Sequence, residues 1–203
     1  MIYQIRHRTS LEDIIYAVNL YFDGLSLRKT SKALSRFVNR SHTAIRDWIE
    51  KYKPQRLLSK SKKIAEFIVD ETLIKVGSAE YIWLWIAIEP ENREILAVTI
   101  SKERNMLIVE RFLSGLVKDY GKRPASTDGG GTWYPQGCEF LKLDHHIHSS
   151  WEKSLIERTM QYIKDRTEGF DDYFPCKKQN CKLEHIKHWI KAFAWHHNNN
   201  IRA

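Results

Sequence analysis

FIVDETLIKV, residues 67–76, sets two adjacent acids, Asp70 and Glu71, in the middle of an apolar run. Buried carboxylates are costly unless they are paired or bound to a metal ion. In a β-strand, successive side chains point to opposite faces, so the two acids need not serve one site. Each acid of this pair therefore needs its own explanation, and Thr72 shares the face of Asp70.

The pattern around this stretch is that of a sheet with helices. From Ile64 the apolar period is two and β-forming residues dominate, which predicts strands over 64–76, 81–90 and 93–102. Further along, the sequence predicts a helix over 105–121, a short strand running into a glycine-rich loop over 123–131, a strand over 140–148, and helices over 149–170 and 183–198. This order of elements indicates an α/β fold with a mixed sheet.

Positive charge is concentrated near the start of the 203-residue chain, whose net charge is +8. Residues 1–63 hold 14 Lys and Arg against 5 Asp and Glu, whereas residues 64–203 hold 19 against 20. A basic front module on a near-neutral body indicates polyanion binding at the N-terminus. The alternative is a general solubilising excess of charge, but the regular helical pattern of the basic segment favours binding.

Residues 1–53 have the pattern of a helix-turn-helix module, and a basic linker follows over 54–63. Ser10, Ser26 and Ser41 are each placed to cap a helix. The first residues of a recognition helix reach base edges, while surrounding basic side chains contact phosphates. We therefore expect base contacts from His42, Thr43 and Arg46, and phosphate contacts from Arg28, Lys29, Lys32, Arg36 and Arg40. The alternative is a plain three-helix bundle with solvated charges.

Three acids stand at informative points of the predicted body. Asp70 is in mid-strand, Asp128 ends a strand directly before three glycines, and Glu157 lies on the following helix with Lys164 seven residues further on. Carboxylates that converge repel one another unless cations neutralise them, and hard oxygen ligands suit Mg²⁺ or Mn²⁺. Two such ions support phosphodiester transfer. The alternative is that these are ordinary acids at strand ends and on a solvated helix face.

Other candidate groups carry weaker signals. His146 and His148 share one face of a predicted strand and form either a ligand pair or polar contacts at a strand edge. Trp133 and Tyr134, just after the glycines, either stack on a splayed base or pack in the core. Trp83 and Trp85 are interpreted as core residues. A zinc site is not favoured, because C-x₄-C followed by two histidines is not the spacing of a zinc finger. The four residues concerned are Cys176, Cys181, His185 and His188.

Some protein classes are disfavoured by what the sequence lacks. No apolar run approaches the length of a membrane span, and the first ten residues lack the apolar stretch of a signal peptide. Three cysteines are an odd number without framework spacing, which indicates a reducing compartment. We therefore expect a cytoplasmic protein with no membrane partner.

Four segments, in this order, resemble the short DDE transposases of the insertion sequence six family, within the retroviral-integrase superfamily. They are LSLRKTSKALSRFVNRSHTAIRDWIEKYKP at 25–54, VDETLIKV at 69–76, STDGGGTWY at 126–134 and SLIERTMQYIKDRT at 154–167. The resemblance implies a ribonuclease-H-like core behind a helix-turn-helix. It also implies that Asp70, Asp128 and Glu157 form a catalytic triad that binds two Mg²⁺ or Mn²⁺ ions, and that Lys164 is the basic residue that follows the glutamate.

The same resemblance implies a function in transposition, in a prokaryotic protein that is associated with the nucleoid. Such enzymes cleave the ends of an insertion sequence and join them to double-stranded target DNA, acting as homodimers or larger multimers. Glu157 follows Asp128 by 29 residues, an interval shorter than is usual in the family, which leaves no room for an insertion domain. Two alternatives remain: an inactive DNA-binding regulator derived from a transposase, and a ribonuclease-H-type metal nuclease. On this basis Asp70 is the expected metal ligand, and Glu71 is a structural or supporting acid whose role is open.

Overall fold

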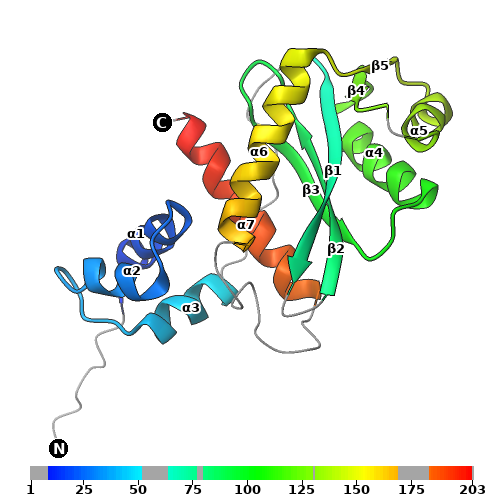
Figure 1. The fold of residues 1–203 in the computed structure, drawn as a ribbon. Coiled ribbons are helices and arrows are strands. Elements are labelled where there is room, and N and C mark those ends of the chain that lie inside the picture. Colours follow the sequence, from blue (N-terminus) through cyan, green and yellow to red (C-terminus); the bar gives the residue numbers. More distant parts are fainter. Residues whose placement is uncertain (1–8, 52–63, 77–79, 130, 169–182, 203) are drawn as a thin grey trace, which may run out of the picture. The chain divides into compact units, whose positions relative to one another are not determined.

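The chain divides into two compact units, residues 1–53 and residues 54–203 (Figure 1). The computed structural model describes residues 9–51, 64–76, 80–129, 131–168 and 183–202. The linker expected over 54–63 lies outside the described residues. Among the described helices, none combines the length and apolar character needed to cross a membrane.

The first unit consists of three short helices, as its sequence predicts: α1 (Leu11–Phe22), α2 (Leu27–Leu34) and α3 (His42–Lys51). Each begins at a serine whose Oγ accepts a backbone N–H three residues on: Ser10 from Asp13 at 3.0 Å, Ser26 from Lys29 at 3.2 Å, and Ser41 from Ala44 at 3.2 Å. These caps satisfy donors that the helix leaves unpaired. A small core is formed by Val18, Phe22, Leu34, Ile45 and Ile49.

The second unit is built on a five-stranded mixed sheet, which confirms the predicted fold class. Its strands are β1 (Phe67–Val76), β2 (Glu80–Ile88), β3 (Ile95–Ser101), β4 (Ala125–Thr127) and β5 (His145–Ile147), in the spatial order β3-β2-β1-β4-β5. The first three strands are antiparallel neighbours, whereas β4 and β5 run parallel to β1. The central strand is therefore the one that carries Asp70 and Glu71.

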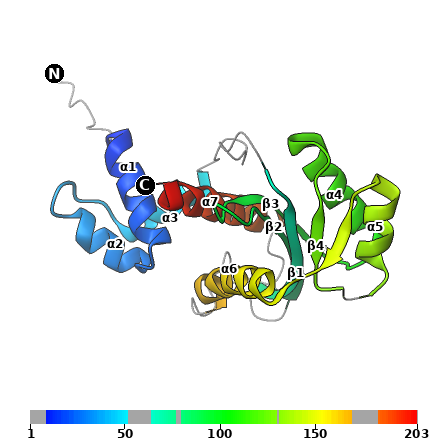
Figure 2. The same cartoon turned by 90° about the horizontal axis from the view of Figure 1, so that it is seen from above.

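Helices cover both faces of this sheet (Figure 2). On one face lie α4 (Met106–Tyr120) and α5 (Trp133–Leu141), and on the other lie α6 (Ser150–Glu168) and α7 (Leu183–Arg202). The core under α4 and α5 includes Phe67, Val69, Trp85, Leu113 and Tyr134. On the opposite face, α6 packs on β1 and α7 packs on β3. Since side chains alternate along β1, its two faces meet different helices.

The helix α5 corrects the predicted order of elements. The sequence predicts a strand over 140–148, but α5 extends to Leu141 and the strand is confined to His145–Ile147. Tyr134, Gly137 and Cys138 are buried at helical spacing, yet Pro135 and Gly137 disguise the segment as a loop. A Cβ on Gly137 would lie 3.1 Å from Val109 Cγ1 on α4, a tight contact, so glycine at this position lets α5 pack closely on α4.

Candidate active site

The sheet register brings Asp70 and Asp128 level with each other. In the parallel pair β1–β4, Ile68 lies opposite Ser126, so Asp128, two residues beyond Ser126, comes beside Asp70. Alternation places Ile68 and Asp70 on the face of β1 that α6 covers. Two acids that are far apart in the sequence are thus adjacent because two neighbouring strands run in the same direction.

A cleft of about 510 Å³ opens beside Asp70. Its lining includes Asp70 and Thr72 from β1, and Glu157, Gln161 and Lys164 from α6. The three α6 residues occupy positions i, i+4 and i+7, so they face the cleft together, as their spacing predicts. Glu157 has 59% of its side chain accessible, and its Oε1 forms an ion pair with Lys153 Nζ at 3.9 Å. The carboxylate of Glu157 is therefore accessible from solvent.

The acids of this site act on one another electrostatically. Burial raises the pKa of Asp70 to about 7; the backbone N–H of Glu71 opposes the rise, and the charges of Glu71, Asp128 and Glu157 add to it. The pKa of an isolated aspartate is far lower because water stabilises its charge. Asp70 is therefore a carboxylate whose charge has little compensation from the protein, which is the environment that a bound cation stabilises.

The loop after Asp128 has a backbone that requires glycine. Gly129 has a φ of +70° and Gly131 a φ of +77°, a region that side chains with a Cβ rarely adopt. A Cβ on Gly129 would also lie 3.2 Å from Ile147 Cγ1. Asp128 itself is exposed and does not line the described cleft. Gly130 lies outside the described residues.

Glu71 has an environment opposite to that of Asp70. Its side chain is 2% exposed and lies 2.5 Å from an Arg104 nitrogen, Nη2. The hydroxyl of Tyr134 donates a hydrogen bond to its other carboxylate oxygen. The Arg104 guanidinium in turn lies over the rings of Trp83 and Trp133, 5.1 Å and 4.9 Å from their centroids. Glu71 is thus a buried structural acid, held by partners from α5 and from the segment before α4.

The balance of forces on Glu71 follows from these contacts. Burial raises its pKa, while the Tyr134 hydrogen bond and the charge of Arg104 lower it, so the two partners stabilise the carboxylate against desolvation. Burial and Glu71 together raise the pKa of Tyr134 well above its usual range, so Tyr134 stays a hydrogen-bond donor. At 1% exposure Tyr134 belongs to the core and cannot stack on a base, and Trp133 packs beside it.

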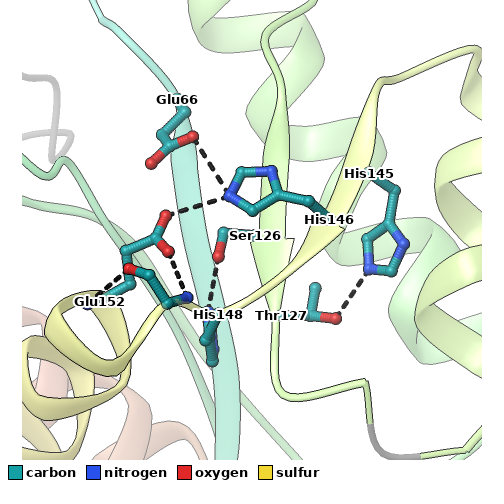
Figure 3. Close-up of polar contacts among 8 residues, drawn as sticks. Glu66, Ser126, Thr127, His145, His146, His148 and Glu152 are labelled. Carbon is teal, nitrogen blue, oxygen red and sulfur yellow. Dashed lines mark hydrogen bonds and ion pairs between the residues drawn. The ribbon is translucent and has the colours of Figure 1, made fainter.

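A second polar cluster joins β5, α6 and the segment just before β1, and none of its three residues lines this cleft (Figure 3). His146 Nε2 on β5 lies 3.1 Å from Glu152 Oε1 on α6 and 3.8 Å from Glu66 Oε2, just before β1. Burial and the neighbouring Glu152 raise the pKa of Glu66 to about 7. Burial also acts to raise the pKa of Glu152, but hydrogen bonds from Ser149 and Glu66 bring it to about 2. Glu152 is not among the residues predicted from the sequence. The S-x-x-E pattern at 149–152 is that of a capping box, and it could have identified Glu152 as a residue that caps the start of α6.

The neighbouring histidines have different partners from His146. His148 Nδ1 lies 2.7 Å from Ser126 Oγ, and His145 Nε2 lies 2.8 Å from Thr127 Oγ1 (Figure 3). Burial lowers the pKa of both rings, so they favour the neutral form. His146 contacts Glu66 and Glu152, whereas His148 contacts Ser126, so the two rings have different partners.

In the helical unit, the predicted DNA contacts divide into exposed and anchored side chains. The exposed ones are His42, Thr43, Arg46, Arg28, Lys29, Lys32 and Arg36. Arg46 forms ion pairs within its own helix, 3.2 Å from Asp47 and 3.7 Å from Glu50. Arg40 is half-buried, and its Nε donates to Thr9 Oγ1 at 2.5 Å. Arg40 thus holds the start of the unit, a structural contact that the sequence did not indicate.

The zinc alternative has only two of its four residues in the described part of the chain. Cys176 and Cys181 lie outside it. His185 and His188 are on α7, and His188 Nε2 lies 3.9 Å from Glu184 on the same helix. These contacts are those of a helix surface.

Comparison with known sequences identifies the family. A family model described as a DDE domain matches residues 63–198, well over half of the chain. The uncharacterized protein MJ0017 of Methanocaldococcus jannaschii is 35% identical over 193 residues, which cover 95% of this chain and 88% of that protein. The match with MJ0017 extends over most of both chains.

Comparison with solved structures concerns the fold. A chain of the simian T-cell lymphotropic virus intasome aligns with a TM-score of 0.51 and 14% identity; this chain is covered to 88% and spans 64% of the length of that chain. The BIV integrase catalytic core aligns at 0.48 with 14% identity, covering 65% of this chain and 82% of that one. The HTLV-2 integrase catalytic core solved with magnesium aligns with a TM-score of 0.47 and 20% identity, covering 64% of this chain and 82% of that one. The family model covers well over half of the chain, and the chain therefore belongs to the DDE-domain family of transposases.

Proposed function

We propose that this protein is a transposase that binds the ends of an insertion sequence, cleaves them and joins them to target DNA. The observation that carries the proposal is the placement of Asp70 and Glu157 in one cleft, with Asp128 close enough to act on the charge of Asp70. Membership of the DDE-domain family supports the same reaction class. The exposed basic residues of the first unit support DNA as the partner.

The acidic residues fit a pair of divalent cations. Asp70, Asp128 and Glu157 offer only hard oxygen donors, which suit Mg²⁺ or Mn²⁺. The raised pKa of Asp70 reflects burial and like charge, which bound cations would offset. When bound, two such ions activate the attacking hydroxyl and stabilise the leaving oxygen of a phosphodiester. These three carboxylates would hold the ions on the face of β1 that α6 covers.

Other residues of the cleft would position the DNA. Lys164 and Arg158 place positive charge on the cleft wall beside Glu157, where a backbone phosphate would enter. Glu71, Arg104 and Tyr134 fix the middle of β1 from its opposite face, which would hold Asp70 in place. Because two element ends must be joined together, we infer that the active form contains at least two copies of the chain.

The decisive experiment is a joining assay with DNA from both flanks of the gene. Purified protein with Mg²⁺ or Mn²⁺ is expected to cleave these flanking ends and join them to plasmid DNA. Asp128→Asn should reduce joining at least about 10³-fold, because one metal ligand is lost, while end binding by the helical unit stays within about twofold.

The outcomes separate the alternatives. Binding of the flanks without joining, under all metal conditions, would favour the regulator. Cleavage without joining would favour the nuclease. Joining by Asp128→Asn at the wild-type rate would contradict the assignment of the triad.

A further inference from the structure

The cluster of Glu66, His146 and Glu152 has the composition of a transition-metal site. Its residues come from three places: just before β1, the middle of β5 and the first turn of α6 (Figure 3). The parallel register sets Ile68, Ser126 and His146 side by side across β1, β4 and β5. Glu66, two residues before Ile68, emerges on the same face, and α6 begins directly after β5.

The three donor atoms point toward a common space. One ligand atom from each residue lies within 4.8 Å of the other two. His146 Nε2 is 3.1 Å from Glu152 Oε1 and 3.8 Å from Glu66 Oε2. Ligand atoms on one first-row metal ion, at bonds of about 2.0–2.2 Å, lie about 3–3.6 Å apart. The separation of His146 from Glu152 already lies in this range, and its separation from Glu66 is only slightly longer.

Glu152 is held in the orientation that such a site needs. Its Oε2 accepts the Ser149 N–H at 2.6 Å, and its own N–H donates to Ser149 Oγ at 3.3 Å, which is a capping box at the start of α6. The other oxygen, Oε1, is therefore directed at His146. Hydrogen bonds that orient a ligating carboxylate are a regular feature of metal sites.

The charges of the cluster favour a cation. Glu152 is 7% and Glu66 20% exposed in their side chains, whereas His146 is 46% exposed and leaves access from solvent. Within the described part of the chain, the ion pairs of both glutamates are with His146, and neither pairs with a lysine or arginine. Two shielded carboxylates and one imidazole form a donor set with an open side, which suits binding of a divalent ion.

We propose that Glu66, His146 and Glu152 bind one divalent first-row transition metal, of the class of Zn²⁺, at a site separate from the Asp70 cleft. The nitrogen donor selects against Mg²⁺, which prefers oxygen ligands. The ion would tie the ends of β1, β5 and α6 together. Since α6 also carries Glu157, the site would fix the helix that completes the acidic cleft, whatever reaction that cleft performs.

The test is calorimetric titration of the full-length chain with Zn²⁺ in excess Mg²⁺. Cys176→Ser and Cys181→Ser are included in every variant, so that thiolates do not contribute. We expect one Zn²⁺ per chain, with affinity reduced at least about 10-fold by His146→Ala and by Glu66→Gln, because each removes a ligand. His145→Ala is the matched control: it lies on the same strand, contacts Thr127, and should leave the affinity unchanged.

Each result decides the proposal. Unchanged affinity in both His146→Ala and Glu66→Gln would overturn it. Loss of Zn²⁺ binding in Asp70→Asn, with retention in Glu66→Gln, would overturn it by assigning the ion to the acidic cleft. If His146→Ala does not fold, Glu66→Gln and the control still decide the matter, and joining activity is not needed for the readout.

Discussion

The two faces of β1 carry adjacent acids with opposite surroundings. Asp70 faces α6 and an open cleft, where burial and neighbouring acids raise its pKa to about 7. Glu71 faces α4 and α5, where Arg104 and Tyr134 pair with both of its oxygens. Among the described residues Asp70 forms no ion pair with a lysine or arginine, whereas Glu71 has both a cation and a hydrogen-bond donor. The difference is the one we expect between an acid that binds a metal ion, as proposed for Asp70, and an acid that stabilises the fold.

This contrast also explains why an acid doublet can sit in a central strand. A buried carboxylate is tolerated when its hydrogen bonds and charge are satisfied, which the contacts of Glu71 achieve. The same contacts hold the strand from its other face, and they thereby restrain the backbone that carries Asp70. Function on one face therefore depends on packing on the other.

The largest expected effect on stability comes from removing the contacts of Glu71. Glu71→Ala should lower the free energy of unfolding by about 3–5 kcal/mol, because Arg104 and Tyr134 lose their partner in a buried site. Tyr134→Phe should lower it by about 1.5–3 kcal/mol, because one hydrogen bond to a charged group is lost. Urea unfolding measured by circular dichroism checks both values.

Glu80→Ala is the control, because Glu80 is an exposed acid on the neighbouring β2 and should stay within about 0.5 kcal/mol of the wild type. A Glu71→Ala variant as stable as this control would contradict the structural role of Glu71.

A smaller effect on the free energy of unfolding is expected from removing the charge of Asp70, and it is stabilising rather than destabilising. The folded-state pKa of about 7 is above the ordinary value of 3.8, so the folded protein binds the proton more tightly than the unfolded chain. In metal-free protein, the contribution of Asp70 to stability therefore falls as pH rises from about 4 to about 7. At pH above this range, Asp70→Asn should be more stable than wild type by about 1–3 kcal/mol.

Thermal unfolding at several pH values with a chelator present measures this effect. The advantage of Asp70→Asn should disappear at the acid end of the range, where Asp70 is protonated in both states. An Asp70→Asn variant that is less stable than wild type throughout would show that the carboxylate is satisfied without a metal.

Much of the fold could be predicted because the decisive signals are local. The serine caps of the three helices, the period-two strands from Ile64 and the polar stripe of α6 depend on spacing that the sequence shows directly. The pairing of Asp70 with Asp128 needed the register of β1 and β4, and the family resemblance supplied the expectation that the two acids meet. Alternation along β1 was sufficient to separate Asp70 from Glu71.

The remaining features depend on contacts between distant segments. Arg104 lies 33 residues after Glu71, and Tyr134 lies 63 residues after it, so nothing near FIVDETLIKV indicates their pairing. The helix α5 escaped prediction because Pro135 and Gly137 disfavour a helix locally, while packing of Gly137 against Val109 stabilises it in the fold. The approach of Glu66 to His146 likewise exists only once β1, β4 and β5 are paired.

The most direct test of the account is Mn²⁺ binding by the acidic cleft, measured by electron paramagnetic resonance. Three chains are compared in a His146→Ala background, which removes the second proposed site: the otherwise unchanged chain, Asp70→Asn and Glu71→Gln. We expect Asp70→Asn to lose Mn²⁺ binding in the cleft and Glu71→Gln to retain it within about threefold, measured below its unfolding temperature. Retention of binding in Asp70→Asn, with loss in folded Glu71→Gln, would contradict the assignment of the metal to the Asp70 face of β1.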